Sequence, residues 1–230
     1  IYENGVSAGT ADTVGVPAKL VHGHIRNQVE NKVDLIFMPS ITTVTSENTE
    51  KTSESMCAVV KGYPFVIRNS DNPEKRWGVP FDTPLFHWYG KVDRDRQLIE
   101  YMKETFHISA NDTMTAIKAA DSAQDAYRRE LTETARAVLE DVERKGTYAV
   151  VLASRPYQND ALVNHDLPAM FTRLGIPVLT ADSLPGLEKE DLSKSRLDVV
   201  NNYHARMLGS AIMAAKRPYL EYVQIVSFGC

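Results

Sequence analysis

The amino-acid sequence predicts an α/β fold in which two halves rich in strands and helices flank a helical middle. Short apolar runs of strand length occur in both halves, and segments with helical spacing of apolar residues alternate with them. A hydrophobic content of 43% in 230 residues is ample for packed cores. We therefore expect a first α/β lobe over residues 1–95, a helical connector over 96–147 and a second α/β lobe over 148–230.

The first half is predicted to contain one helix and two strands. A helix is expected over 18–30, and the apolar run 34–38, which a proline ends, is typical of a buried parallel strand. The Ser, Thr and Glu residues of 42–55 indicate a surface loop or a frayed helix. The run 65–67 is a second strand candidate, and the aromatic, proline-containing stretch 69–89 is expected to be irregular.

The middle of the chain predicts a long helix. Ser109 and Asp112 belong to a segment that resembles a capping box, in which short side chains accept the first free N–H groups of a helix. Apolar residues then recur at helical spacing as far as Val142, and Gly146 ends the run. We interpret this stretch as a structural spine between the two lobes, formed by one helix or by two with a single break.

The second half predicts a parallel sheet. Strands are expected over 148–153, 176–179 and 222–226, with one helix that ends at Gly175 and another over 199–216 between them. Because strand and helix alternate, right-handed crossovers would place these strands parallel to one another. Ligands of open α/β sheets bind outside the carboxyl ends of the strands, so we expect any binding site at that edge.

Composition narrows the class of protein and its compartment. The net charge of -4 comes from mixed signs along the chain, which argues against a nucleic-acid partner. No stretch of about 18 uncharged apolar residues predicts a membrane span. Two cysteines far apart in sequence, and a start without a signal-peptide pattern, favour a reducing cytoplasm. Because the chain begins without Met and stops just beyond its last strand, we expect a fragment truncated at its C-terminus.

The loop after the strand over 148–153 holds the candidate binding residues. The guanidinium of Arg155 is suited to a phosphate or carboxylate, and the ring of Tyr157 is suited to stacking or to donating a hydrogen bond. The alternative is that Arg155 pairs with a neighbouring acid in an ordinary surface loop. Position alone favours the two interpretations about equally.

Other patterns give little support for catalysis. His22 and His24 point apart if they lie on a helix, so we interpret them as helix histidines and not as metal ligands. Asn164 and His165 are expected to cap or pack a helix. The sequence contains no phosphate-binding P-loop, no G-x-G-x-x-G, no H-E-x-x-H and no G-x-S-x-G. ATP hydrolysis, dinucleotide binding and serine hydrolysis therefore have no local support.

Six blocks of the sequence, in order along the chain, resemble one family. The family is that of the activase-associated relatives of 2-hydroxyacyl-CoA dehydratases, which include the 2-hydroxyglutaryl-CoA dehydratase component. The blocks are residues 16–25, 33–39, 57–64, 154–157, 164–168 and 227–230. Together they cover both halves and leave only the helical middle undiagnostic. The resemblance implies two Rossmann-like lobes and a place in anaerobic metabolism.

The resemblance also implies an iron–sulfur cluster and an activase partner. In such proteins cysteine thiolates hold the cluster, and an ATP-dependent activase passes it an electron for the reduction of an acyl-CoA. Cys57 and Cys230 match positions of metal ligands, whereas Gly15 and Ser40 stand where the family tends to have cysteine. Two thiolates are fewer than the four that a 4Fe-4S cluster normally takes. Serine, histidine or a second chain would have to complete the set.

Three hypotheses follow. The first is a dehydratase-related electron-transfer component that binds a cluster through Cys57 and Cys230 with additional ligands. The second is a cluster-free relative that binds an acyl-CoA or another anionic small molecule in a cleft lined by Arg155 and Tyr157. The third is a structural or regulatory domain that docks an activase module. Iron content separates the first from the others, and binding of a CoA ester separates the second from the third.

Overall fold

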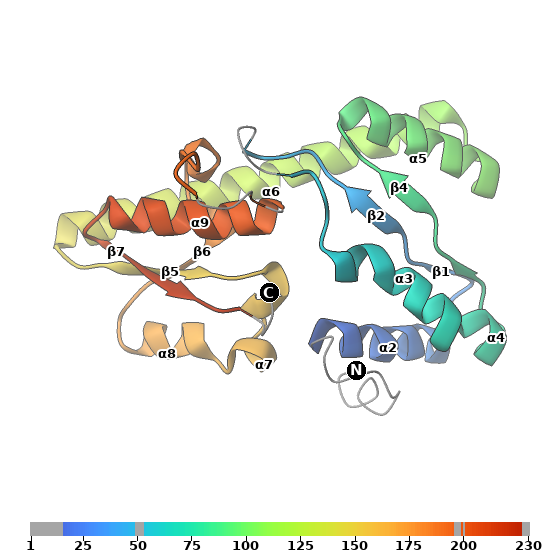
Figure 1. The fold of residues 1–230 in the computed structure, drawn as a ribbon, viewed down its shortest axis with the longest axis horizontal. Helices are drawn as coiled ribbons and strands as arrows, with labels where there is room; N and C mark the ends of the chain where they lie inside the picture. The colour runs from blue at the N-terminus through green and yellow to red at the C-terminus, as the bar shows by residue number, and fades with distance from the viewer. Residues whose placement is uncertain (1–15, 49–52, 196–198, 200, 227–230) are drawn as a thin grey trace. The chain divides into compact units, whose positions relative to one another are not determined.

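The computed structural model describes residues 16–48, 53–195, 199 and 201–226, and the chain divides into two compact units (Figure 1). Unit 1 comprises Ile1–Thr45 and Ser55–Gln97, and unit 2 comprises Ser46–Glu54 and Leu98–Cys230. Every pair of strands in the described sheets is parallel, which confirms the predicted α/β class. The sheets have only two or three strands each, so the Rossmann-like lobes and their boundaries stay predictions.

Unit 1 contains two short parallel strand pairs and the helices that cover them. Its elements in chain order are α2 (Val16–Glu30), β1 (Ile36–Phe37), β2 (Ser40–Thr43), α3 (Ala58–Ser70), α4 (Pro73–Trp77), β3 (Phe81–Asp82), β4 (Leu85–His87) and the start of α5 (Lys91–Phe106). Strand β1 pairs with β3, and β2 pairs with β4. The buried core residues are Ala18, Ile25, Ile36, Tyr63, Ile67 and Phe81. The predicted helix over 18–30 and the strand within 34–38 are confirmed.

Two predictions for unit 1 are wrong, and a third is confirmed in part. Residues 65–67 lie inside helix α3 and not in a strand. The helix buries Tyr63 and Ile67, which are four residues apart on one face, and exposes Val66; a run of three apolar residues does not distinguish this pattern from a strand. Of the segment 42–55, expected to be a surface loop or a frayed helix, Thr42 and Thr43 end strand β2, whereas residues 44–48 lie in no helix or strand, as a loop would. The segment 69–89, expected to be irregular, contains α4, β3 and β4.

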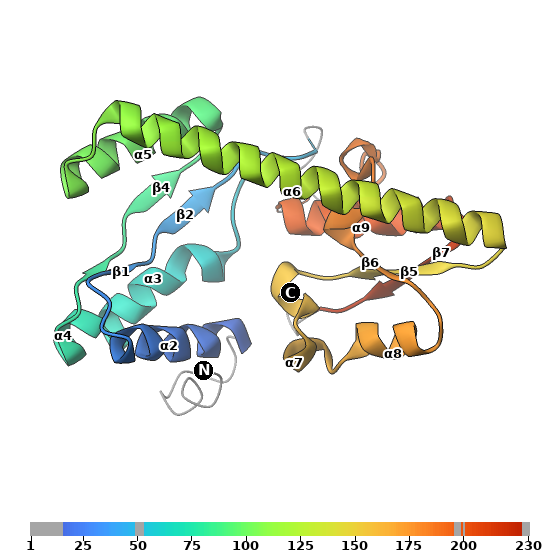
Figure 2. The same ribbon diagram turned by 180° about the vertical axis from the view of Figure 1, so that it is seen from behind.

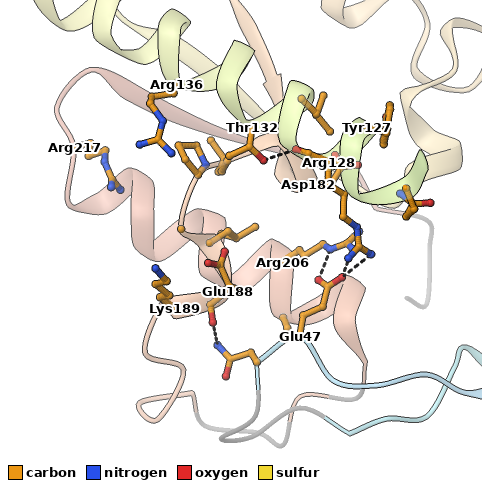
Figure 3. Close-up of a pocket in the computed structure, with 18 residues that line it drawn as sticks. Glu47, Tyr127, Arg128, Thr132, Arg136, Asp182, Glu188, Lys189, Arg206 and Arg217 are labelled. Carbon is orange, nitrogen blue, oxygen red and sulfur yellow. Dashed lines mark hydrogen bonds and ion pairs between the residues drawn. The ribbon is translucent and has the colours of Figure 1, made fainter. Parts of the chain in front are cut away.

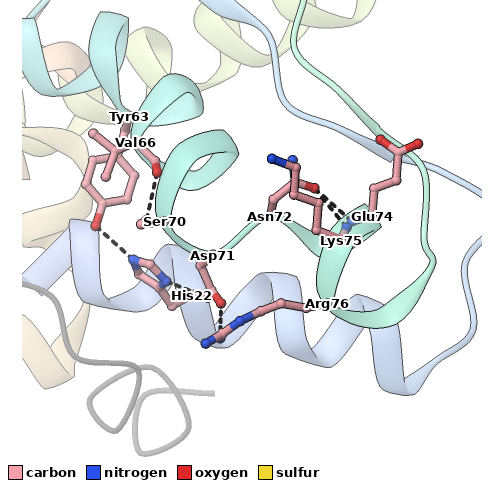
Figure 4. Close-up of polar contacts among 9 residues, drawn as sticks. All are labelled: His22, Tyr63, Val66, Ser70, Asp71, Asn72, Glu74, Lys75 and Arg76. Atoms are coloured by element: carbon pink, nitrogen blue, oxygen red, sulfur yellow. Dashed lines mark hydrogen bonds and ion pairs between the residues drawn. The ribbon is translucent and has the colours of Figure 1, made fainter.

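A buried polar network joins three helices of unit 1 (Figure 4). His22 of α2 is 2% exposed, and its Nδ1 lies 2.8 Å from Oδ2 of Asp71. Its Nε2 lies 3.2 Å from the hydroxyl of Tyr63 on α3. Arg76 of α4 donates to the other carboxylate oxygen of Asp71. Both ring nitrogens of His22 are therefore used within unit 1, whereas His24, two residues further along α2, is exposed.

Unit 2 contains a three-stranded parallel sheet with helices on both faces (Figures 1 and 2). Its elements after α5 are α6 (Ala110–Lys145), β5 (Ala149–Ala153), η2 (Pro156–Asn159), α7 (Ala161–Asn164), α8 (Leu167–Arg173), β6 (Val178–Thr180), η3 (Ala181–Ser183), η4 (Leu187–Lys189), α9 (Asn202–Ala215) and β7 (Leu220–Gln224). The strand order is β6-β5-β7. Helices α6 and α9 lie over one face, and α7 and α8 lie over the other.

The long helix and the central strand of unit 2 follow directly from the sequence. Helix α6 runs unbroken for 36 residues; the Ser109 hydroxyl accepts from the backbone N–H of Asp112 at 3.1 Å, and Gly146 ends it with a φ of 63°. Ala135, Leu139 and Val142 on one face of α6 pack in the same core as strand β5, of which every residue is buried. Among the described residues, none of the helices combines the length and the apolar character that crossing a bilayer requires.

Candidate functional site

The carboxyl edge of the sheet in unit 2 is the place where the topology favours a ligand site. The chain leaves β5 for α7 and α8 on one face, and it returns from β6 to β7 through α9 on the other face. This order, with the first strand between the second and the third, creates a topological switch point between β5 and β7. The N–H of Ile225 donates to the carbonyl of Ala153 at 3.0 Å, so the ends of the two strands stay paired at that edge.

Arg155 and His204 meet at this edge. Nη2 of Arg155 lies 3.2 Å from Nε2 of His204, although the residues come from the loop after β5 and from the first turn of α9. A guanidinium can only donate, so Nε2 accepts and the neutral ring carries its proton on Nδ1. The pKa of His204 lies below its ordinary value of 6.5, because burial disfavours the charged ring and the positive charge of Arg155 repels it. The pair is therefore a permanent cation beside a neutral imidazole.

The start of helix α9 adds to the positive character of this edge. Asn201 is the N-cap residue, and its side chain accepts from the backbone N–H groups of Tyr203 at 3.1 Å and His204 at 3.2 Å. The N-terminal end of a helix carries a partial positive charge, so α9 favours an anion near its first turn. The sequence predicted a helix here but gave no indication that His204 faces Arg155, because the two are 49 residues apart.

The turn that carries Arg155 and Tyr157 is fixed by buried amides. The backbone N–H of Arg155 donates to Oε1 of Gln158 at 2.9 Å, and Nδ2 of Asn164 donates to the carbonyl of Gln158 at 3.0 Å. Gln158 and Asn164 are both buried, and Tyr157 lies half-buried in the same turn. Binding by Arg155 and Tyr157 stays a prediction, but both side chains stand at the edge where the sequence analysis expected them.

The segment that follows this turn contains a buried polar atom without a partner and two residues with a strained backbone. Oδ1 of Asn164 is buried and has no hydrogen-bond partner. His165 and Asp166 then adopt left-handed conformations, with φ of 55° and 58°. A left-handed conformation costs a residue other than glycine about 1–2 kcal/mol, and such strain gathers near ligand sites. The sequence predicts only a capping or packing role for Asn164 and His165, and the backbone strain carries no signal in the sequence.

The four positions that bear on an iron–sulfur cluster have different outcomes. Gly15 and Cys230 lie outside the described residues. Cys57 is half-buried and is the N-cap residue of α3 in unit 1. Ser40 is fully buried, and its hydroxyl donates to the carbonyl of Lys61 at 2.7 Å. The Ser40 hydroxyl thus has a structural role between β2 and α3.

The donor set of the described residues does not fit a complete cluster site. Cys57 is the one thiol among them, and they contain no group of three or more His, Cys, Asp or Glu side chains that could hold a metal ion. A 4Fe-4S cluster normally needs four thiolates or nearly so. Any cluster would therefore depend on ligands from outside the described part of the chain.

Polar groups without partners lie near Cys57 at the carboxyl ends of β2 and β4. Oγ1 of Thr43 and Nε1 of Trp88 are buried and have no hydrogen-bond partner, and the backbone N–H of Trp88 donates to the carbonyl of Thr43 at 3.2 Å. Thr43 also forms a β-bridge with Ser55, which accepts from Nζ of Lys61 at 2.8 Å. Buried polar atoms without partners are rare and call for a partner such as a water or an ion, so this edge of unit 1 is a second candidate site.

Comparison with known proteins identifies the family. Residues 1–184 match the family described as CoA enzyme activase uncharacterised domain (DUF2229), which is most of the chain and includes the blocks around Cys57 and Arg155. No curated protein and no solved structure matches the chain.

Proposed function

Because the chain belongs to the family of the CoA enzyme activase uncharacterised domain, we propose that it is a component of a 2-hydroxyacyl-CoA dehydratase/activase-type system and that unit 2 binds an anionic ligand of the acyl-CoA class. The observation that carries this proposal is the contact between Arg155 and His204 at the switch point of the sheet. An ATP-dependent activase is the partner that this proposal assigns to the chain.

The chemistry of the pair suits an anion. A guanidinium is always charged and presents five N–H donors in a planar fork that matches carboxylate and phosphate oxygens. His204 takes one of these donors and, being neutral, orients the fork without cancelling its charge. The positive end of α9 adds to the same field. Tyr157 in the same turn supplies an aromatic face and a hydroxyl for the uncharged part of the ligand.

Binding of acetyl-CoA measured by isothermal titration calorimetry tests the proposal. Arg155→Gln should raise the Kd about tenfold, because a hydrogen bond to a charged group contributes roughly 1.5 kcal/mol or more. Arg129→Gln is the matched control, since it removes the same charge from an exposed position on α6. Equal affinities of the wild type and Arg155→Gln would contradict the assignment of the site.

A second candidate function is iron–sulfur electron transfer through Cys57 and Cys230. The observation in its favour is the N-cap position of Cys57 at the start of the 13-residue helix α3. The positive end of a helix stabilises a thiolate, and the thiolate is the form of cysteine that binds iron. Iron and sulfide per chain, after strictly anaerobic reconstitution, should be stoichiometric in the wild type and absent in Cys57→Ala. If neither protein bound iron specifically, electron transfer would be excluded and the cluster-free binding of an anion would be the remaining function.

A further inference from the structure

A groove of about 830 Å³ in unit 2 gathers more positive than negative side chains (Figure 3). It is lined by α6, by the segment of η3 and η4 that follows β6, and by residues of α9 and its C-terminal end. Its cationic residues are Arg128, Arg136, Lys189, Arg206 and Arg217. Its carboxylates are Glu47, Asp182 and Glu188. Five cations against three carboxylates leave two positive charges in excess, whereas the whole chain has a net charge of -4.

One of the three carboxylates is held in an ion pair at one side of the groove. Glu47 accepts from Nε of Arg206 at 2.8 Å and from Nη2 at 2.5 Å, and Nη2 of Arg128 lies 3.8 Å from the same carboxylate. Burial alone would lower the pKa of Arg206, but the hydrogen bonds to Glu47 and the negative charges of Glu47 and Asp182 together outweigh it, and the pKa is raised. Glu47 therefore compensates Arg206, and in part Arg128, at this end of the groove.

The remaining three cations, Arg136, Lys189 and Arg217, lie at the other end of the groove, on the left in Figure 3. Within the described part of the chain, the side chains of Arg136 and Lys189 form no hydrogen bond or ion pair. Arg217 has one, a donation from Nη1 to the carbonyl of Met213 at the long distance of 3.4 Å. Like charges that share a concave surface repel each other and concentrate anions.

Ordered elements fix the backbone of these three residues. Arg136 follows Ala135, which is 1% exposed in the face of α6 that packs on the sheet. Lys189 ends η4, where its backbone N–H donates to the carbonyl of Gly186 at 3.0 Å. The backbone N–H of Arg217 donates to Ala214 at the end of α9 at 3.0 Å. Cations on fixed backbone lose little entropy when they bind a multivalent anion.

An aromatic surface lies along the same helix. Tyr127 is 58% exposed and lines the groove, as does Leu131 one turn further on. Tyr127 and Arg136 are separated by about 13.5 Å along the axis of α6, at 1.5 Å per residue. Both residues line the groove, and an exposed tyrosine ring offers a stacking face to a base.

We propose that this groove binds the diphosphate of a nucleoside diphosphate group, with the phosphates at Arg136, Lys189 and Arg217 and the base against Tyr127. This site is separate from the contact between Arg155 and His204 and does not depend on the function proposed for that pair. A free nucleotide and coenzyme A both carry this chemical group, so either is a source of the ligand.

Isothermal titration of the whole chain with ADP, inorganic diphosphate and coenzyme A at low ionic strength tests the proposal. Arg136→Gln and Arg217→Gln should each raise the Kd for ADP about tenfold, since each removes a charged donor. Glu188→Gln should lower the Kd by about twofold to threefold, because it removes a repelling carboxylate from the rim. Arg129→Gln, outside the groove on the same helix, should leave the Kd unchanged.

The probes separate the parts of the proposal. Tyr127→Leu should weaken ADP but not inorganic diphosphate; equal affinity of the two probes for the wild type would overturn the contact with the base. Tighter binding of coenzyme A than of ADP, weakened by Arg136→Gln and Arg217→Gln, would support the proposal and assign the source to the coenzyme. Absence of ADP binding at millimolar concentration, or equal Kd values in the wild type and both arginine variants, would overturn the site. Circular dichroism spectra that match the spectrum of the wild type would show that the variants of the groove residues and the control variant are folded.

Discussion

Replacement of His22 by alanine should destabilise unit 1 strongly, because it breaks the network that joins α2, α3 and α4 (Figure 4). The substitution removes two hydrogen bonds, each of which contributes about 1 kcal/mol net. It also leaves the carboxylate of Asp71, 5% exposed, with Arg76 and without its histidine, at a further cost of about 1–2 kcal/mol. We expect the free energy of unfolding to fall by about 3–4 kcal/mol.

Tryptophan fluorescence reports on this unit alone, because the two tryptophans of the chain, Trp77 and Trp88, both belong to unit 1. Urea unfolding followed by that signal gives the change in free energy without interference from unit 2. His24→Ala is the matched control, since His24 is exposed two residues further along α2 and its loss should change stability by less than about 0.5 kcal/mol. A loss of under about 1 kcal/mol for His22→Ala would refute the reasoning.

Three further predictions concern other parts of the chain. Because the pKa of His204 is lowered in the folded chain, the unfolded chain takes up a proton first as the pH falls. The contribution of His204 to stability is therefore fully present above about pH 6.5 and declines as the pH falls from there towards the folded-state pKa. The melting temperature should be lower at about pH 5.5 than at about pH 7.5, and His204→Gln should make this difference smaller. Leu139→Ala should cost unit 2 about 2–5 kcal/mol, because it opens a cavity between α6 and the sheet, and faster amide exchange in β5 would reveal this. Ser40→Ala should lower the urea stability of unit 1 by about 1–2 kcal/mol, because the carbonyl of Lys61 loses its donor, and tryptophan fluorescence measures the loss.

The elements that the sequence predicted well are those with strong local signals. Helix α6 has a capping serine, a continuous apolar face and a terminal glycine, and β5 is a run of apolar residues long enough to be buried on both faces. Helix α3 was misread because Pro64 and three adjacent apolar residues look like the end of a loop and a strand. Strands β3 and β4 have only two and three residues, too few for any periodicity.

The candidate sites depend on contacts that no local pattern encodes. Arg155 was predicted because it follows a recognisable strand, but its partner His204 lies on another helix and meets it only through the packing of α9 on the sheet. The cations of the groove likewise come from α6, from η4 and from the end of α9. These cations come together only in the folded chain, and the net charge of -4 gives no indication of a local excess of positive charge.

Titration of the imidazole resonances of His204 by nuclear magnetic resonance, with and without saturating acetyl-CoA, tests the central claim most directly. The positive charge of Arg155 contributes to the lowered pKa of His204, so an anion bound by Arg155 should offset that charge and raise the pKa towards its ordinary value. Arg155→Gln should raise the pKa without ligand and abolish the response to acetyl-CoA. A pKa of His204 that stays the same when acetyl-CoA is bound would contradict the account.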